Sequence, residues 1–416
     1  MSGFMADGSF TGLSDRADHV RAARPTATAV VHPLVPPAAV NAPVCEPIYQ
    51  SSAWSFDSLA QAEAVFSGVA VGIPHRAYGS PNHRLLESLL AELEQAESCV
   101  TTAGGMSALA AVFWTLLEPG ARVIASHDLF GVTAALLGDM QRWGVTTTYV
   151  DATDVGVVAD ALRQSARLVL IESISNPRMR VPDIERLARL AHDHGALLIV
   201  DNTLAGPYHC RPITFGADMV VEAATKALAG HHDVVLGAIA ARQEIITPMR
   251  SLIERAGLGP GAFDVWLARR GTMSYALRQE RASANAAQLA DWLAARDAIQ
   301  AVHYPGRTDH PDHEVARRML TSGYGSMLSL EIDTSHLDVD TFLAALEHIR
   351  LVHSLGGAAT SLSHAVTMTH RCAGEDRRRE LGLHWGFFRM SVGIESIADV
   401  ISELERALHD AASTER

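Results

Sequence analysis

The sequence predicts an α/β fold in which a parallel-rich sheet domain precedes a smaller C-terminal α+β domain. Three observations predict it. The chain has 416 residues, of which 48% are hydrophobic, so it can bury the cores of two domains. In the middle of the chain, short apolar runs alternate with helical stretches, as in βαβ units. In the last third, the pattern changes to long helices with few strands between them.

Residues 1–70 are predicted to be an N-terminal tail and an extended arm. The beginning of this region is rich in Ala, Pro, Gly and polar residues, and Pro33, Pro36 and Pro37 lie close together. No helical or strand period is sustained there. Met1 to Arg24 also lack the apolar stretch of a signal peptide.

Residues 71–270 are predicted to form the large domain. Leu85 to Gln95 has the apolar spacing of a helix, and the segment from Cys99 leads through Gly104 and Gly105 into a second apolar helix that begins near Met106. Five apolar runs follow that we expect to be strands of one sheet. They are residues 122–126, 146–150, 168–172, 197–200 and 219–221.

Residues 271–416 are predicted to form the small C-terminal domain. A long helical stretch runs from Tyr275 to about Ala295. Strand candidates lie at residues 326–332 and 387–392, each followed by helical sequence. No internal repeat is visible in this region or in the rest of the sequence.

The charge balance excludes several classes of partner. A net charge of -13 and an isoelectric point near 5.8 argue against nucleic acid and against an anionic membrane surface. No apolar run is long enough to span a membrane. The four cysteines show neither CxxC spacing nor the density of a disulfide framework, so we expect a cytoplasmic protein.

Lys226 is the only lysine among the 34 Lys and Arg residues, which leaves 33 arginines (34 minus 1). Arginine stays protonated in proteins, whereas a desolvated lysine can lose its proton, attack a carbonyl and form a Schiff base. A lysine left by chance in an arginine-rich chain would explain the scarcity of lysine but not its location.

Asp201 and Lys226 lie just beyond two of the predicted strands, 25 positions apart (226 minus 201). Functional groups of open parallel sheets lie at the carboxyl ends of strands. A lysine and a carboxylate at neighbouring strand ends suit pyridoxal 5'-phosphate (PLP), because the lysine holds the aldehyde and the carboxylate keeps the ring nitrogen protonated. The Gly104–Met106 turn at a helix N-terminus suits a phosphate.

These residues belong to a longer set of motifs, through which the chain resembles the cystathionine γ-synthase and γ-lyase group of Cys/Met-metabolism PLP enzymes. The resemblance extends from about Pro47 to the C-terminus. The matching segments are residues 47–53 (PIYQSSA), 105–108 (GMSA), 172–177 (ESISNP), 200–203 (VDNT), 216–218 (GAD), 225–226 (TK), 230–233 (GHHD), 261–264 (GAFD), 354–357 (SLGG), 368–370 (MTH) and 389–395 (RMSVGIE).

The resemblance implies the aspartate-aminotransferase-like fold, known as fold type I of PLP enzymes, and a homotetramer built from dimers. It implies that Lys226 forms the Schiff base with the cofactor and shuttles protons, and that Asp201 contacts the pyridinium nitrogen. Asn176 is similar to the residue that contacts the ring hydroxyl. Gly105, Met106 and Thr225 fall where the family binds the phosphate.

For the substrate, the resemblance implies that Arg389 clamps the α-carboxylate, and a guanidinium fork suits a planar carboxylate in any case. Ser354 matches a serine near the lysine and the substrate. Phe130 stands where the family has a tyrosine that stacks on the cofactor ring. Phenylalanine can stack, but it has no hydroxyl for proton transfer or for a leaving group.

Other departures lie at the phosphate. In the family a Tyr-x-Arg pair reaches the phosphate site of the neighbouring subunit, whereas this chain has His75 and Ala77, with Arg76 displaced by one position. We retain Arg76 as a candidate phosphate ligand. The family's serine before the Thr-Lys pair is Ala223, and its glutamate after the Gly-Gly pair is Ala359, so a phosphate contact and a substrate contact are changed.

The predicted reaction is γ-elimination or γ-replacement on a homoserine-derived or sulfur amino acid, and the partner is a small amino-acid substrate. The Ser-His-Ala sequence at 363–365 favours the synthase branch. Two alternatives stay open. One is a lyase for a non-sulfur γ-substituted amino acid, motivated by Phe130 and Ala359, and the other is a non-catalytic homologue, motivated by the missing phosphate contacts.

Two histidine-rich stretches resemble metal ligands by composition. Residues 303–314 contain His303, His310 and His313, but a Pro-rich surface connection explains them better than converging ligands do. The stretch 231–233 belongs to a loop that the family shares. We therefore expect no metal site.

Overall fold

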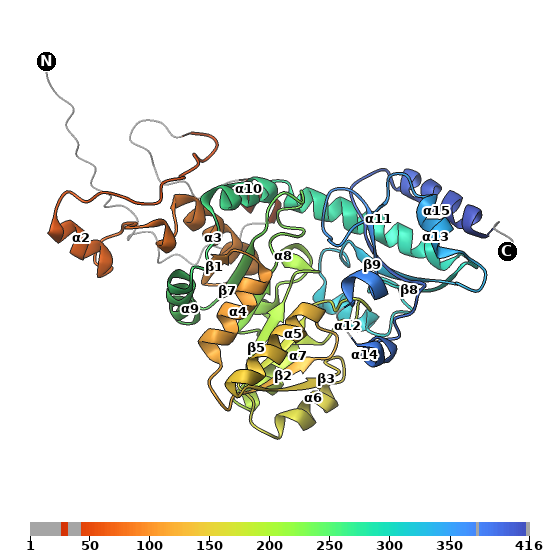
Figure 1. The fold of residues 1–416 in the computed structure, drawn as a ribbon, viewed down its shortest axis with the longest axis horizontal. Coiled ribbons are helices and arrows are strands. Elements are labelled where there is room, and N and C mark those ends of the chain that lie inside the picture. The colour runs from red at the N-terminus through yellow and green to blue at the C-terminus, as the bar shows by residue number, and fades with distance from the viewer. Residues whose placement is uncertain (1–25, 32–42, 372–373, 413–416) are drawn as a thin grey trace, which may run out of the picture.

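The computed structural model describes residues 26–31, 43–371 and 374–412. Two sheets form two lobes that lie side by side along the long axis of the molecule (Figure 1). The larger lobe contains a seven-stranded sheet and the smaller lobe a five-stranded one. This architecture confirms the predicted α/β class with a smaller second sheet.

The large sheet is parallel except for one strand. Strand β7 runs antiparallel to both of its neighbours, β1 and β6, while the β6–β5, β5–β4, β4–β2 and β2–β3 pairs are parallel. The strands in spatial order are β1 (Ser98–Thr102), β7 (Gly237–Ala241), β6 (Met219–Glu222), β5 (Leu197–Asp201), β4 (Leu168–Glu172), β2 (Arg122–Ser126) and β3 (Thr146–Val150).

Helices cover both faces of the large sheet, so its central strands are apolar on both sides. In β4, Leu168 and Leu170 pack with helices α4 (Gly105–Leu116), α5 (Gly131–Met140) and α9 (Gln243–Ala256). The alternate residues, Val169 and Ile171, pack on the opposite face. That face is covered by α3 (Pro81–Glu94), α6 (Val155–Leu162) and α7 (Ile184–Asp193).

The small lobe is an antiparallel-rich sheet packed against helices. Phe342, Phe388 and Leu404 are fully buried in its core. The strands in spatial order are β10 (Arg350–Leu351), β11 (Ser361–His364), β12 (Phe387–Ser391), β9 (Met327–Ile332) and β8 (Ile299–His303). The helices are α11 (Tyr275–Ala294), α12 (His313–Met319), α13 (Val339–Ala344), α14 (Glu375–Glu380) and α15 (Ile397–Ala412), with the π-helical turn η4 (Ala365–Thr369).

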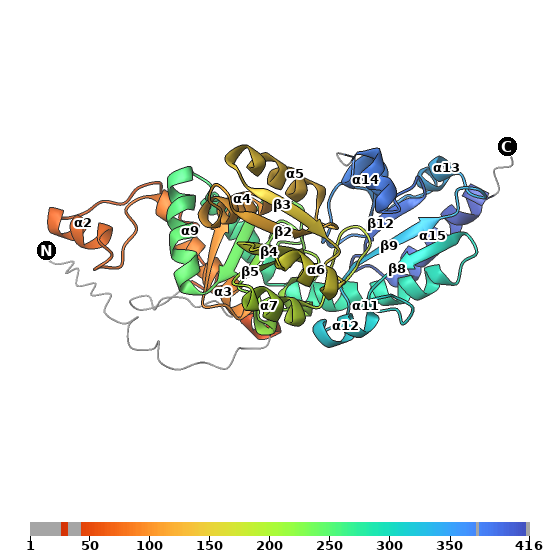
Figure 2. The same ribbon diagram turned by 90° about the horizontal axis from the view of Figure 1, so that it is seen from below.

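The arm projects from the large lobe. Helix α2 (Leu59–Phe66) contains no buried residue and stands apart from both sheets in two perpendicular views (Figures 1 and 2). The segment before it is anchored on α10 (Ala262–Thr272), where Trp266 Nε1 donates to Glu46 O at 3.0 Å. Short elements complete the fold: α1 (Thr26–Ala29), η1 (Arg76–Tyr78), η2 (Gln141–Trp143), α8 (Gly206–His209) and η3 (Pro212–Phe215).

Most predicted elements are confirmed within one or two residues at their ends. The first helix of the large domain begins earlier than predicted, at Pro81 rather than Leu85, because Pro81 occupies the first helical turn. Strand β7 was not predicted, since a Gly-Ala-Ile-Ala-Ala sequence lacks the β-branched pattern of the other strands. The predicted tail at residues 1–25 and 32–42 lies outside the described residues. The domain boundaries at residues 70 and 270 stay a prediction.

No helix in the described part of the chain is both long and apolar enough to cross a membrane.

Candidate functional site

A cleft between the two lobes brings the predicted site residues together. It has a volume of about 330 Å³ and is lined from the large lobe by the carboxyl ends of β4 and β5, by the loop after β6 and by the N-terminus of α4. The small lobe contributes the segment at Ser354 and strand β12. The lining contains nine of the ten predicted site residues, Gly105, Met106, Phe130, Asn176, Asp201, Thr225, Lys226, Ser354 and Arg389.

Lys226 lies in the loop after β6 with its amine directed at the small lobe. Its Nζ donates to Ser354 Oγ at 3.3 Å. Partial burial lowers the pKa of the ammonium group, and the positive charge of Arg389 lowers it further. The neutral amine, which is the nucleophilic form, is therefore more accessible at neutral pH than for an ordinary lysine.

Asp201 ends strand β5 and faces the same cleft. Its Oδ1 accepts the N–H of Thr203 at 3.0 Å, which fixes the orientation of the carboxylate. Burial raises the pKa of Asp201, while the hydrogen bonds from Thr203 oppose that shift. Within the described chain the carboxylate has no ion-pair partner, so a cation that enters the cleft would stabilise its charged form.

Arg389 lies at the centre of β12 and is almost completely buried. Its Nη1 donates to Asn176 Oδ1 at 3.0 Å and its Nη2 donates to Ser363 Oγ at 3.3 Å. Among the described residues its Nε has no hydrogen-bond partner. Burial lowers the pKa of this guanidinium to about 10, and Glu172 partly opposes that shift. A buried cation without a directly paired carboxylate in the described chain is suited to an anionic ligand.

Phe130 is held by a buried glutamate that was not predicted as a site residue. The Phe130 N–H donates to Glu172 Oε1 at 2.6 Å, and the Asn176 N–H donates to Glu172 Oε2 at 3.1 Å. Burial raises the pKa of Glu172 well above its usual range, and the nearby Asp201 raises it further. Both carboxyl oxygens are thus occupied in fixing two residues that line the cleft.

The opposite end of the cleft is formed by the N-terminus of α4. The helix begins at Gly105 and has no side-chain cap, so the N–H groups of its first turn are available to an anion. A Cβ at Gly105 would lie 2.9 Å from the Cβ of Ala223, so the two segments approach too closely for a larger residue at position 105. Ala223 offers no polar group there.

Thr225 lines this end, but its hydroxyl is engaged elsewhere. Its Oγ1 donates to Leu236 O at 3.2 Å and accepts the Leu236 N–H at 2.9 Å. A hydroxyl has one proton, and here that proton is directed at the carbonyl of Leu236 rather than at the cleft. The α4 end therefore offers backbone N–H groups as its main donors.

These groups fit PLP. The amine of Lys226 matches an aldehyde, and a protonated pyridine ring would supply the cation that Asp201 lacks. The first turn of α4 matches the phosphate by both its N–H groups and its dipole. Arg389 then remains for the carboxylate of an amino-acid substrate. The cleft thus offers a partner for the aldehyde, the ring nitrogen and the phosphate of the cofactor, and one for the carboxylate of the substrate.

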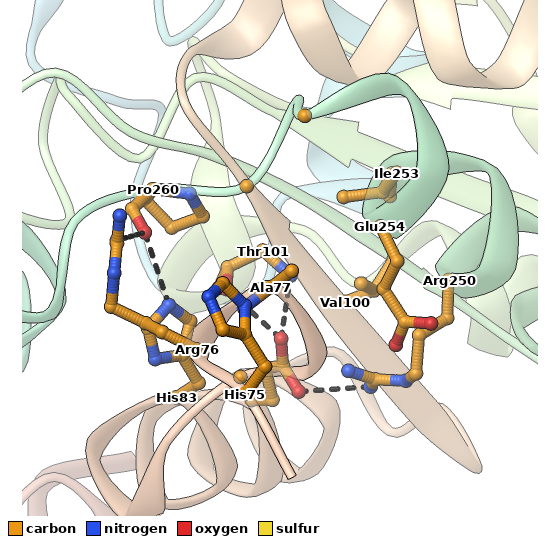
Figure 3. A pocket seen from close by; sticks show the side chains of 14 residues that line it. His75, Arg76, Ala77, His83, Val100, Thr101, Arg250, Ile253, Glu254 and Pro260 are labelled. Atoms are coloured by element: carbon orange, nitrogen blue, oxygen red, sulfur yellow. Dashed lines mark hydrogen bonds and ion pairs between the residues drawn. The ribbon is translucent and has the colours of Figure 1, made fainter. Parts of the chain in front are cut away.

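Arg76, the tenth predicted residue, lies outside this cleft. Figure 3 shows its side chain extended toward Pro260, in a separate pocket that also contains His75 and Arg250. The Arg76 Nη1 donates to Pro260 O at 3.3 Å. Within one chain Arg76 therefore contacts its own large lobe, and a contact with a neighbouring subunit's phosphate stays a prediction.

The histidine-rich stretch at residues 303–314 is held by hydrogen bonds within it and by an ion pair to the large lobe. His313 Nδ1 bonds Pro305 O at 3.0 Å, and His310 Nδ1 accepts the Asp312 N–H at 3.2 Å. Asp312 forms an ion pair with Arg180 of the large lobe at 2.6 Å. Across the described ranges no group of three or more His, Cys, Asp or Glu is arranged to hold a metal ion.

A pair of buried carboxyl groups lies behind the lysine loop. Glu94, at the end of α3, is 2% exposed, and Glu222, at the end of β6, is 4% exposed. Glu94 Oε1 accepts from Asn202 Nδ2 at 3.0 Å. Burial raises the pKa of Glu94 to about 7. Burial likewise raises the pKa of Glu222, and the nearby Glu94 adds to that shift.

Comparison with known proteins decides the family. Residues 27–409 match the model of the family described as Cys/Met metabolism PLP-dependent enzyme. The chain belongs to this family. The predicted cofactor, PLP, and the prediction of a PLP-dependent enzyme of cysteine and methionine metabolism are thereby confirmed.

Individual relatives cover most of the chain. An L-methionine gamma-lyase of Fusobacterium nucleatum subsp. polymorphum is 35% identical over 366 residues, which are 87% of this chain and 92% of the relative. A cystathionine beta-lyase of Lactococcus lactis subsp. cremoris is 33% identical over 92% of this chain and 98% of the relative. The structure of cystathionine gamma synthase from Xanthomonas oryzae pv. oryzae in complex with cystathionine superimposes with a TM-score of 0.89 at 33% identity, covering 94% and 99% of the two chains.

Two lining residues have chemistry that the sequence predictions missed. Glu172 ends β4 beside Asp201, and its place at a strand end was a signal that pointed to it. His353 lines the mouth of the cleft directly before Ser354. His353 lies on an irregular connection and does not follow a predicted strand, so the sequence pattern did not mark it as a site residue.

Proposed function

We propose that this protein catalyses elimination or replacement of the γ-substituent of a homoserine-derived or sulfur amino acid. The observation that carries the proposal is the pairing, in one cleft, of a lysine of lowered pKa with a buried guanidinium that has no carboxylate partner in the described chain. The lysine suits proton transfer at carbon, and the guanidinium suits the α-carboxylate of an amino acid.

When bound, PLP would supply an electron sink that makes the protons on the amino-bearing carbon, and then those on its neighbour, acidic. Arg389 orients the substrate by its α-carboxylate, and Asn176 keeps the guanidinium in place through its 3.0 Å hydrogen bond. The amine of Lys226 takes and returns protons at Cα and Cβ, and Ser354 Oγ at 3.3 Å directs that amine. Asp201 provides negative charge at the strand ends.

The reaction class is tested by product analysis. The purified protein with PLP is incubated with methionine, cystathionine, O-succinylhomoserine and canavanine, with and without an added thiol. We expect release of a four-carbon 2-oxo acid and ammonia, or incorporation of the thiol at Cγ. Release of pyruvate instead would show β-elimination, and no product from any of the four would contradict the proposal.

We also propose that the protein works as a homotetramer built from two dimers, as the resemblance implies. The exposed arm supports a contact with another subunit, because Leu59 is 90% exposed and Phe66 is 62% exposed on a helix without buried residues. Light scattering of the intact chain and of a Leu59→Glu, Phe66→Glu variant tests it. A wild-type monomer would overturn this part of the proposal.

A cytoplasmic location is the remaining part of the proposal. The three cysteines that lie in the described ranges, Cys45, Cys99 and Cys210, are free thiols. Free thiols are typical of a reducing compartment.

A further inference from the structure

Among the described residues, five titratable side chains line the cleft, and four of them are already engaged. Asp201 accepts the Thr203 N–H, and Glu172 uses both oxygens to hold backbone N–H groups. Arg389 holds Asn176, and Lys226 contacts Ser354. The fifth is His353, whose imidazole makes no hydrogen bond within the described chain.

The segment that carries His353 is fixed tightly against the lysine loop. Gly356 has a φ of +76°, and a Cβ there would lie 2.5 Å from the backbone nitrogen of Ala227. The Gly356 N–H donates to Ser391 Oγ at 2.8 Å, which ties the same segment to strand β12. The segment that follows His353 is therefore fixed by contacts on two sides, and His353 directly precedes Ser354, the serine that contacts Lys226.

Two cations of the same cleft act electrostatically on the imidazole of His353: Arg389 from β12 and Lys226 from the loop after β6. Partial burial lowers the pKa of His353, and these two charges lower it further. At neutral pH the neutral imidazole dominates, which accepts a proton from a thiol. The minor protonated form is a stronger acid than an ordinary imidazolium.

The reaction needs a group of this kind near the γ-substituent. A departing alkyl thiolate is basic, so its departure is faster when an acid protonates the sulfur. Phe130 has no hydroxyl, and the hydroxyl groups of serine and threonine are too weakly acidic to act alone. Lys226 is occupied with protons at carbon in the proposed function. Of the titratable groups in the cleft, this leaves His353.

We propose that His353 is a catalytic residue that passes a proton to the departing sulfur atom at Cγ, and takes it back from an entering thiol. In elimination, Lys226 removes the Cβ proton and that electron pair forms the Cβ–Cγ double bond. The Cγ–S bond breaks with its electron pair on sulfur, and the imidazolium proton completes the thiol. In replacement, neutral His353 takes the thiol proton as the S–Cγ bond forms. The electron pair of the Cβ–Cγ double bond moves to Cβ, where Lys226 returns the proton. The inference rests on the proposed function.

The test compares two leaving groups in the holoenzyme of the His353→Gln variant. Methionine loses an alkyl thiol, which is less acidic than a cysteine side chain of pKa about 8.5, whereas O-acetylhomoserine loses a carboxylate with a pKa of about 4 that needs no acid. We expect the turnover of methionine to fall about 100-fold and that of O-acetylhomoserine less than about threefold. The matched control is His336→Gln, an exposed histidine outside the cleft, which leaves both rates unchanged.

A second readout separates this inference from the proposed function. Exchange of the Cα proton of alanine for deuterium, followed by NMR, requires Lys226 but no leaving group. We expect exchange at the wild-type rate in His353→Gln. Equal losses with both leaving groups, loss of exchange, or full methionine turnover in the variant would each overturn the role of His353 alone. Absence of exchange and turnover in the wild type would instead overturn the proposed function.

Discussion

At the lysine end of the cleft, side chains supply the chemistry: Lys226, Asp201 and Arg389 each have a charge and a fixed orientation. At the α4 end, the polar contacts come mainly from backbone N–H groups, because Ala223 has no hydroxyl and Thr225 directs its proton at Leu236 O. Side chains thus support the reaction steps, whereas backbone N–H groups support retention of the cofactor phosphate.

This difference teaches that the two properties can be changed separately. A backbone N–H cannot be removed by substitution without changing the fold, whereas a side-chain donor can be added where one is missing. Changes at the lysine end are expected to alter turnover, and changes at the α4 end are expected to alter how strongly the phosphate is held.

The largest effect should come from the lysine end. Substitution Arg389→Leu removes the only buried guanidinium in the described cleft lining, so we expect kcat/KM to fall by about 10²–10³-fold, as for the loss of charged hydrogen bonds. Arg389→Lys keeps the charge but loses the forked pair of N–H donors of the guanidinium. Its kcat/KM should therefore lie between those of the wild type and Arg389→Leu. Steady-state kinetics with far-UV circular dichroism as a check of folding measure this, and an undiminished kcat/KM in Arg389→Leu would contradict the assignment.

A gain in PLP affinity is expected from a substitution at the α4 end of the cleft. Ala223→Ser places a hydroxyl beside Gly105, and one hydrogen bond to a charged phosphate should raise the affinity for PLP by about tenfold or more. Titration of the apoprotein followed by visible absorbance measures the affinity. Pyridoxal, which lacks the phosphate, is the control ligand and should bind both proteins equally. A matching gain for pyridoxal would show that the effect lies elsewhere in the cleft.

The buried carboxyl pair behind the lysine loop, Glu94 and Glu222, should make the stability of the fold depend on pH. Burial raises the pKa of Glu94 from 4.5 to about 7, so the folded state binds this proton more tightly than the unfolded state. Its stabilising contribution is full below the unfolded value of 4.5 and is lost as pH rises through about 7. Melting temperatures across this range should fall less in Glu94→Gln than in the wild type, and parallel curves would refute the shift.

The smallest effect is expected for Thr225→Val. Because the Thr225 hydroxyl donates to Leu236 O, its loss should lower the stability by about 1 kcal/mol and change the PLP affinity less than about threefold. Thermal melting and the same absorbance titration measure both quantities. A large loss of affinity with unchanged stability would indicate that the hydroxyl turns to the phosphate when PLP binds.

The sheet strands were predictable where burial leaves a simple pattern. Strands β2 and β4 are short apolar runs between turns, and the sequence identifies both. Strand β7 lacked that pattern because it is a chain of small residues, and Gly237 is required where a Cβ would lie 2.3 Å from Gly104 O. Its antiparallel direction depends on long-range pairing with β1 and β6, which local sequence does not encode.

The site residues were predictable where the chemistry needs a rare residue type. They were much less predictable where the role depends on the direction in which a side chain points. A single lysine and an aspartate at strand ends pointed to PLP before any geometry was known. The direction of the Thr225 hydroxyl and the contact of Arg76 with Pro260 depend on neighbours brought together by folding. His353 was missed for the same reason, since only the cleft places it near Lys226 and Arg389.

The central claim is that Lys226 is the covalent attachment point for PLP, and the sequence makes its test direct because the chain has no other lysine side chain. The purified protein with PLP is reduced with borohydride, digested and mapped by mass spectrometry, and the Lys226→Ala variant is treated in parallel. We predict a visible absorbance band and one reduced PLP adduct on the Lys226 peptide in the wild type, and neither in the variant. An unmodified Lys226 peptide, or the same band in Lys226→Ala, would contradict the account.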